Sequence, residues 1–190
     1  MNLPNKLTMG RVFLIPFFML CAWRHWWLAA GILFAAASFT DYLDGHIARK
    51  NHLVTDFGKF ADPLADKLLT TVAFLYMLVD GVCSPVVLTL ILAREFAVAG
   101  VRMIAAGAPG GKVIAANMWG KVKTVLQMVT ILVYYFGMAL ETRLAGGTLT
   151  ASVCTTQLIA AALCWVVAAV TVISGAQYIW NNRQYINTAK

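Results

Sequence analysis

Residues 39–70 read FTDYLDGHIARKNHLVTDFGKFADPLADKLLT and hold five of the eight acidic side chains in a chain of 190 residues. Apolar runs without a charged side chain border this stretch at 25–40 and 68–79. A short connection between two helices makes them antiparallel neighbours. The stretch therefore predicts that one apolar helix ends and the next begins at a single polar edge of the fold, and it places most of the carboxylates at that edge.

The rest of the chain is strongly apolar. Hydrophobic residues make up 61% of it and charged residues only 12%, whereas about a quarter of a soluble domain is charged. One globule of this length cannot bury so much apolar surface, and about 20 apolar residues cross a bilayer as a helix. Uncharged runs recur at 12–23, 25–40, 68–79, 81–93, 124–140 and 144–182. We expect one domain, residues 1–190, with an all-α integral membrane fold of six transmembrane helices.

Polar and Gly- or Pro-containing stretches predict where these helices end. A short interfacial segment at 2–10 is expected before the first helix, and outer turns are expected at 24–27, 80–85 and 141–148, with inner turns at 51–56 and 107–111. The expected helix ends lie near Trp23, Lys50, Val79, Ala106, Leu140 and Trp180.

The positive charge is distributed unevenly over this topology. With both termini in the cytoplasm, thirteen of the fifteen basic residues fall on the inner side and only Arg24 and Arg143 on the outer side. This asymmetry is typical of the positive-inside rule. The formal charge of +7 therefore marks one membrane face, and no aromatic-basic platform indicates a nucleic-acid partner. The four cysteines show no metal-binding spacing.

The spacing of four aspartates predicts paired carboxylates. Asp41 and Asp44 are three positions apart, and Asp62 and Asp66 are four apart, so each pair shares one helix face. Four carboxylates in contact repel one another unless cations hold them. Oxygen ligands without histidine or cysteine suit Mg²⁺ or Mn²⁺ rather than zinc. A pair of metals roughly 3.5–4 Å apart is the arrangement that clamps the oxygens of a phosphoryl displacement.

The spacing alone leaves a second reading open, in which these acids lie in a solvated loop and pair with neighbouring cations. The cations concerned are Arg49, Lys50, Lys59 and Lys67. Small residues favour the metal site, because Gly45 and Ala48 leave room beside it and Gly58 precedes Asp62 by one turn. Arg49 can bind phosphate as a charged fork. These residues describe a metal-assisted phosphate site at a membrane surface.

The pattern Asp41-x2-Asp44-Gly45-x2-Ala48-Arg49-x8-Gly58-x3-Asp62-x3-Asp66 resembles the signature of the CDP-alcohol phosphatidyltransferases. Eight fixed positions match by chance on the order of once in 10¹⁰ starts. Three further blocks are similar to the bacterial phosphatidylglycerophosphate synthases: NLPNKLTMGRVFLIPF (2–17), LAREFAVAGVR (92–102) and WGKVKT (119–124).

The resemblance implies both a fold and a reaction. It implies a homodimer in the bacterial inner membrane, with six helices around a polar cavity that opens to the cytoplasm. The reaction joins CDP-diacylglycerol and sn-glycerol 3-phosphate into phosphatidylglycerophosphate and CMP. The implied roles are metal binding by Asp41, Asp44, Asp62 and Asp66, proton acceptance by Asp66, and binding of CDP-diacylglycerol by Gly45, Ala48, Arg49 and Gly58.

The acceptor needs a cationic pocket for its phosphate. The candidates in or near the inner halves of the fourth and fifth helices are Arg94, Arg102, Lys121 and Lys123, and we expect Glu95 to orient Arg94. Another acceptor, serine or inositol phosphate, stays open within the family. An ion or phosphate transporter is a remote alternative, because its acids should be spread through the depth of the membrane.

Overall fold

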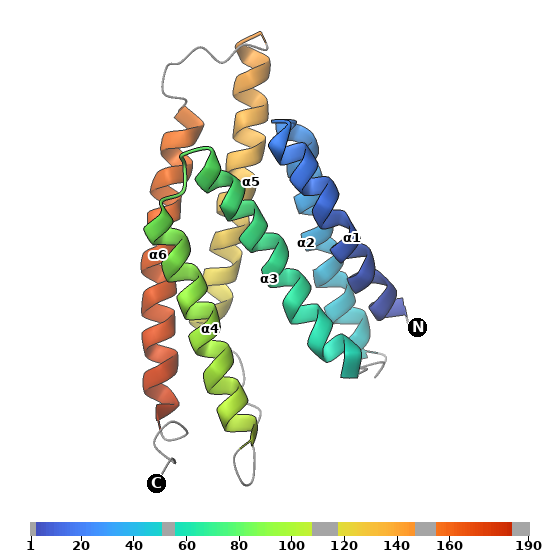
Figure 1. Cartoon of the computed structure of the whole chain (residues 1–190), viewed down its shortest axis with the longest axis vertical. Coiled ribbons are helices and arrows are strands. Elements are labelled where there is room, and N and C mark those ends of the chain that lie inside the picture. Colours follow the sequence, from blue (N-terminus) through green and yellow to red (C-terminus); the bar gives the residue numbers. More distant parts are fainter. Residues whose placement is uncertain (1–2, 51–55, 108–117, 147–154, 184–190) are drawn as a thin grey trace.

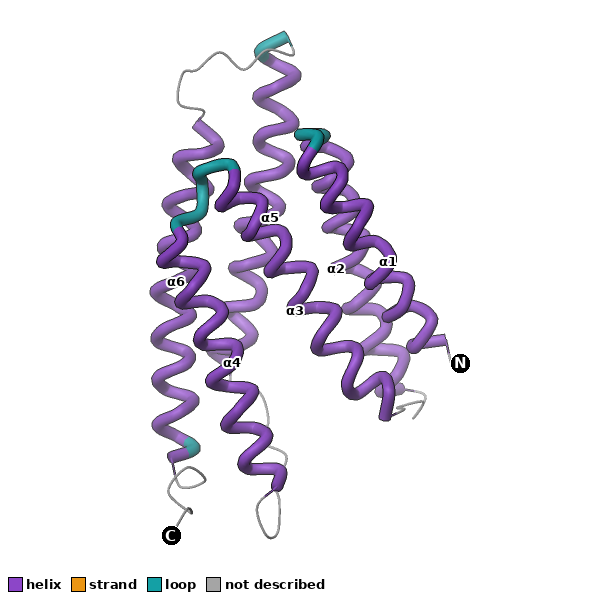
Figure 2. The backbone as a smooth tube through the Cα atoms, in the orientation of Figure 1, coloured by secondary structure: helices purple, strands orange, loops and turns teal. Residues whose placement is uncertain are grey.

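The computed structural model describes the chain at 3–50, 56–107, 118–146 and 155–183; of the side chains in these ranges, those at 3–8, 41–50, 56–66 and 106 are outside the description. All six expected helices are present, and the described residues contain no strand (Figure 1, Figure 2). The helices are α1 (Leu3–Trp23), α2 (Trp27–Lys50), α3 (Asp56–Val79), α4 (Pro85–Gly107), α5 (Met118–Leu144) and α6 (Thr155–Asn181).

Most helix ends agree with those expected from the uncharged runs, but two differ. Helix α1 begins at Leu3, so the segment at 2–10 is not a separate lead-in, since Pro4 lies in the first turn, where proline is tolerated. Helix α5 continues past Leu140 to Leu144, because no glycine or proline interrupts it. It ends just before Gly146, whose positive φ of 65° suits a glycine that follows a helix.

The helices pack as two linked groups. Helix α1 packs against α2 and α3, α6 packs against α5 and α4, and α2 joins the groups through α5 (Figure 1). The core holds mainly large apolar and aromatic side chains, such as Phe18, Phe34, Tyr134 and Tyr135. Tight contacts also occur without large side chains. A Cβ at Gly137 on α5 would lie 2.4 Å from Thr156 Cγ2 on α6.

The alternating direction of the helices gives the molecule two distinct ends (Figure 1). We call one the tryptophan end. It holds the α1–α2 turn at 24–26, the α3–α4 turn at 80–84 and the last turn of α5. The other, the aspartate end, holds the end of α2 and the start of α3, and the described parts of both termini lie on that side (Figure 1).

Two of the described helices, α5 and α6, are long and apolar enough to cross a membrane. Shorter apolar stretches occupy Met9–Trp23, Trp27–Thr40 and Lys67–Val79. Large apolar side chains are exposed on several helices: Phe13, Phe17, Ile32, Phe96, Trp165 and Ile173. Soluble monomers rarely expose contiguous apolar patches of large size, so this outer surface is typical of a protein that contacts lipid.

Candidate active site

The four aspartates of the signature lie on the two helices expected from the sequence. Asp41 and Asp44 fall within α2, and Asp62 and Asp66 fall within α3, at the aspartate end. Their side chains lie outside the described part of the chain. The same holds for the surroundings of the four residues expected to bind CDP-diacylglycerol. Those four are Gly45, Ala48, Arg49 and Gly58.

A carboxylate next to this region gathers three cations. Glu95 on α4 accepts Lys123 from α5 and Arg94 Nη1 through its Oε1 atom, the latter at 3.3 Å. Its Oε2 atom lies 3.5 Å from Lys67 Nζ on α3. We call these four residues the Glu95 cluster. It links three helices, and through Lys67 it reaches the position directly after Asp66.

The Glu95 cluster is largely buried and carries excess positive charge. The Lys123 side chain is only 4% exposed and that of Arg94 12%, whereas Lys67 is 44% exposed. Buried charges are strongly unfavourable unless they are paired. Among the described residues, one carboxylate balances one of the three cations, which leaves two positive charges. Such a cluster suits a doubly charged phosphate, because charge-assisted hydrogen bonds to phosphate are strong.

Arg94 lies in a narrow slot between helices. Its Nη2 atom donates a hydrogen bond of 2.9 Å to Ser174 Oγ on α6. A Cβ at Gly175 would lie 2.8 Å from Arg94 Cγ, and one at Gly120 on α5 would lie 3.4 Å from Arg94 Nη2. The slot therefore requires glycine at 175. Arg94 Nε is buried and has no hydrogen-bond partner among the described residues, so one of its donors is not used by any described group.

The four cations expected around the acceptor do not all meet. Arg94 and Lys123 come together at Glu95, but Arg102 lies about 12 Å further along α4. There it donates to the Tyr178 hydroxyl at 3.3 Å and lies over the Tyr178 ring. Lys121 is exposed, because it is two positions, about 200° of helix, from Lys123.

Sequence reasoning missed the contact of Lys67 with Glu95 and that of Ser174 with Arg94. It expected Glu95 to orient Arg94, and the 3.3 Å contact confirms that pairing. It considered Lys67 only as a partner of the nearby acids. No local pattern shows that Lys67 faces α4 or that Ser174 faces Arg94, because these contacts join residues 28 and 80 positions apart in sequence.

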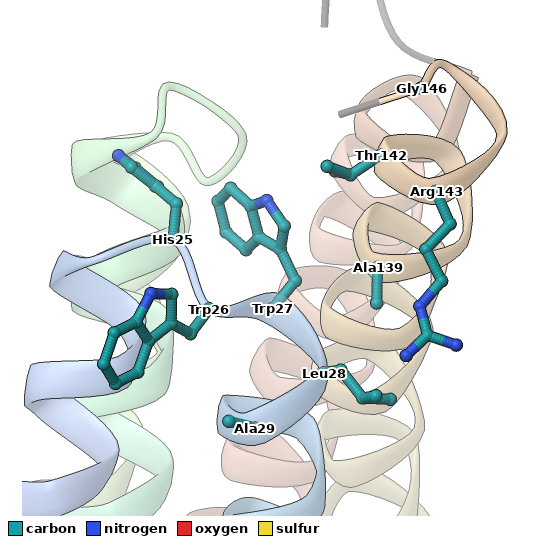
Figure 3. A pocket seen from close by; sticks show the side chains of 9 residues that line it. All are labelled: His25, Trp26, Trp27, Leu28, Ala29, Ala139, Thr142, Arg143 and Gly146. Carbon is teal, nitrogen blue, oxygen red and sulfur yellow. The ribbon is translucent and has the colours of Figure 1, made fainter. Parts of the chain in front are cut away.

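A cavity of about 520 Å³ lies at the tryptophan end, and Figure 3 shows the side chains that line it. It is lined by His25, Trp26, Trp27, Leu28, Ala29, Ala139, Thr142, Arg143 and Gly146. It contains no carboxylate, and no group of three metal-ligating side chains occurs within the described ranges. This cavity therefore offers no counterpart to the chemistry expected of the aspartates.

Beside that cavity, Asp80 has a different environment from Glu95. The Tyr134 hydroxyl donates to Asp80 Oδ2 at 2.7 Å, and His25 Nδ1 lies 3.9 Å from Oδ1. Burial raises the pKa of Asp80 above its usual value, although the hydrogen bond from Tyr134 and the charge of His25 act in the opposite direction. Among the described residues, this carboxylate has one possible cation, His25, at 3.9 Å.

Comparison with known proteins identifies relatives over most of the chain. The family model described as CDP-alcohol phosphatidyltransferase matches residues 1–173. A protein of Bacillus subtilis is 44% identical over 145 residues, which cover 68% of this chain and 74% of the relative. One of Rickettsia felis is 35% identical over 187 residues, 97% of each chain. One of Escherichia coli K12 is 36% identical over 137 residues, 68% of this chain and 74% of the relative. All three relatives are named CDP-diacylglycerol–glycerol-3-phosphate 3-phosphatidyltransferase.

Proposed function

The chain belongs to the CDP-alcohol phosphatidyltransferase family, and from this premise we propose that it makes phosphatidylglycerophosphate. The enzyme transfers the phosphatidyl group of CDP-diacylglycerol to sn-glycerol 3-phosphate and releases CMP. The observation that carries this assignment is the full aspartate signature on α2 and α3, in a chain whose relatives bear the name of this activity over two thirds or more of their length.

The aspartates fit a pair of divalent cations by their chemistry. Asp41, Asp44, Asp62 and Asp66 offer only oxygen ligands, which Mg²⁺ and Mn²⁺ prefer. They come from two consecutive helices that meet at the aspartate end. Cations held there would supply the positive charge that neutralises the diphosphate and the departing CMP.

The remaining work falls to side chains of this protein. A hydroxyl oxygen of the acceptor forms a bond to the lipid-side phosphorus as the bond from that phosphorus to the CMP oxygen breaks. The acceptor proton passes to Asp66, which acts as the general base. Gly45, Ala48 and Gly58 leave space for the nucleotide lipid, and Arg49 binds its diphosphate as a planar cation.

The Glu95 cluster provides the acceptor's phosphate site. Arg94 and Lys123 supply the charge, and the buried Nε donor of Arg94 supports this role. Lys67 lies beside Asp66 in sequence and contacts Glu95 at 3.5 Å, so the phosphate site lies next to the segment that carries the base. Arg102 and Lys121 act further out, where a dianionic substrate first meets the protein.

The membrane orientation follows from charge and apolar length. Helices α5 and α6 can each cross a bilayer, and the basic residues gather on the side of the aspartates. The aspartate end and both termini would then face the cytoplasm. CDP-diacylglycerol would approach this site from the inner leaflet, and the water-soluble acceptor would approach it from the cytoplasm.

One assay tests the assignment. Purified protein in detergent or lipid, supplied with CDP-diacylglycerol and Mg²⁺, is given sn-glycerol 3-phosphate, serine or inositol phosphate in separate reactions, and CMP release is measured. We expect release with glycerol 3-phosphate only. Release with serine or inositol phosphate instead would assign a different acceptor, and no release with any acceptor would contradict the proposed activity.

A further inference from the structure

Glu95 occupies a special position among the described carboxylates. It contacts three cations that come from three helices, Lys67 on α3, Arg94 on α4 and Lys123 on α5. The other two described carboxylates, Asp80 and Glu141, contact no lysine or arginine among the described residues, and Asp80 has only His25 at 3.9 Å as a possible cation. Asp80 accepts from a tyrosine hydroxyl and Glu141 from the backbone N–H of Thr156 at 2.9 Å.

Without Glu95 the cations would not stay where they are. Lys123 is almost fully buried, and a buried cation without a counter-charge is strongly unfavourable. Three cations that share one carboxylate also repel one another once that carboxylate is removed. The negative charge of Glu95 therefore determines whether α3, α4 and α5 can present their cations at one place.

Glu95 leaves the cations able to bind a further anion. An arginine has five N–H donors and a lysine three. Arg94 uses Nη1 for Glu95 and Nη2 for Ser174, while its Nε has no partner in the described part of the chain. Lys123 gives Glu95 one of its donors. Hence the carboxylate does not saturate the two cations that it holds.

We propose that Glu95 is a positioning residue that preassembles Arg94 and Lys123 as the binding site for the acceptor's phosphate. The inference rests on the proposed function and adds to it a residue that does not itself touch the substrate. Through Lys67, Glu95 also ties this phosphate site to α3 at the position after Asp66, so it sets the separation between the bound acceptor and the base.

The competing idea is that Glu95 acts as a latch. In that case the carboxylate occupies the phosphate's place and must release the cations before the acceptor binds. The two ideas predict opposite effects of removing the charge. A latch that is removed strengthens acceptor binding, whereas a lost positioning residue weakens it.

The test compares Glu95→Gln, which removes the charge at nearly constant volume, with Glu95→Asp, which keeps the charge on a shorter side chain. Glu141→Gln serves as the control, because it removes an acid from a helix at the tryptophan end. Apparent KM is measured for glycerol 3-phosphate and for CDP-diacylglycerol, together with kcat and the elution profile of each purified variant.

We expect Glu95→Gln to raise the KM for glycerol 3-phosphate about tenfold and to change the KM for CDP-diacylglycerol less than about twofold. Glu95→Asp should recover part of the loss, and Glu141→Gln should match the wild type in both constants. A lower KM for glycerol 3-phosphate in Glu95→Gln would establish the latch. Equal increases in both constants would show a merely structural role.

Two further results distinguish a failure of this inference from misfolding of a variant and from a failure of the proposed function. If Glu95→Gln does not fold, the Glu95→Asp variant decides, because a positioning role requires its KM for glycerol 3-phosphate to exceed that of the wild type. If both Glu95→Asp and Glu95→Gln fold and keep the wild-type KM for glycerol 3-phosphate, the inference about Glu95 is overturned, but the proposed function is not. Failure of the wild type to release CMP with glycerol 3-phosphate overturns the proposed function.

Discussion

The surroundings of Asp80 and the Glu95 cluster, two charged regions of the described structure, differ in the number of cations that meet one carboxylate. At the tryptophan end, one partly buried carboxylate, Asp80, meets a tyrosine hydroxyl and the mostly exposed His25. In the Glu95 cluster, one carboxylate meets three cations. The first arrangement lies within aromatic packing and needs no ligand. Among the described residues, the second is left with positive charge that an added anion could balance.

The packing around the two centres shows the same contrast. Tyr134, which holds Asp80, packs edge to face against Tyr135 and Trp27, with ring centroids 5.1 and 5.7 Å apart. Such pairs stabilise a fixed core. Arg94 is held instead by Ser174 and by glycines that make room for it. We infer that the tryptophan end serves stability and the Glu95 cluster serves binding, and the predictions below test that division.

The largest effect is expected from the aspartates that we propose as metal ligands. Asp41→Asn, Asp44→Asn and Asp62→Asn should each abolish turnover, because each removes a charged oxygen ligand from a site that must neutralise a diphosphate. Treatment of the wild type with a chelator should do the same, and added Mg²⁺ should restore activity. Asp80→Asn at the tryptophan end is the matched control and should keep wild-type turnover. Full activity after chelation would contradict the two-metal site.

Asp66 should separate chemistry from binding. Asp66→Asn is expected to lower kcat by at least ~10²-fold, the lower range for a lost general base, and to leave binding of CDP-diacylglycerol largely intact. Binding of the nucleotide lipid and single-turnover rate are measured on the same purified variant. A loss of binding that parallels the loss of rate would identify Asp66 chiefly as a ligand.

Arg94 should matter to one substrate only. Arg94→Ala is expected to raise the KM for glycerol 3-phosphate by about 10- to 100-fold, the range for a lost hydrogen bond to a charged group. The KM for CDP-diacylglycerol should change far less. Arg102→Ala should have the smaller effect, because Arg102 contacts Tyr178 rather than Glu95. Equal effects on both substrates would place Arg94 at the diphosphate or give it a structural role.

A pair of glycines tests the two regions with the same substitution. In Gly175→Ala the new methyl group would lie 2.8 Å from Arg94 Cγ. It should displace the guanidinium and raise the KM for glycerol 3-phosphate about 5-fold. In Gly137→Ala the methyl group would lie 2.4 Å from Thr156 Cγ2, which should lower the Tm and leave both KM values unchanged. If Gly175→Ala instead changed only the Tm and Gly137→Ala changed the KM for glycerol 3-phosphate, the assignment of binding to one region and stability to the other would be wrong.

The smallest effect concerns Asp80 and pH. Burial raises the pKa of this carboxyl, so its contribution to stability is fully present below the unfolded pKa of about 3.9 and is lost as the pH rises through the higher folded value. The Asp80→Asn variant has no carboxyl to ionise at this position, so it does not lose this stability as the pH rises. Its Tm relative to the wild type should therefore be higher at pH 7 than at pH 4. A difference that does not depend on pH would show that Asp80 is not perturbed by burial.

The sequence predicted the helices better than the contacts among them. Uncharged runs located α2 and most other helix ends, because apolar length is a local property of the chain. The aspartate signature and Arg94 and Lys123 were found from pattern, and these two cations do meet. Their convergence on Glu95, with Lys67 added and Arg102 and Lys121 left apart, depends on which faces of α3, α4 and α5 oppose one another. No run of neighbouring residues encodes that.

The slot around Arg94 has a thermodynamic consequence. A free arginine side chain loses up to about 1.5–2 kcal/mol of rotamer entropy when it is fixed. Here Glu95 and Ser174 hold the guanidinium from two helices, and the close approach to Gly175 restricts its stem. The side chain is therefore ordered when the helices pack, before any substrate arrives. Association of the acceptor's phosphate then needs no further ordering of this arginine, so more of the interaction energy remains as affinity.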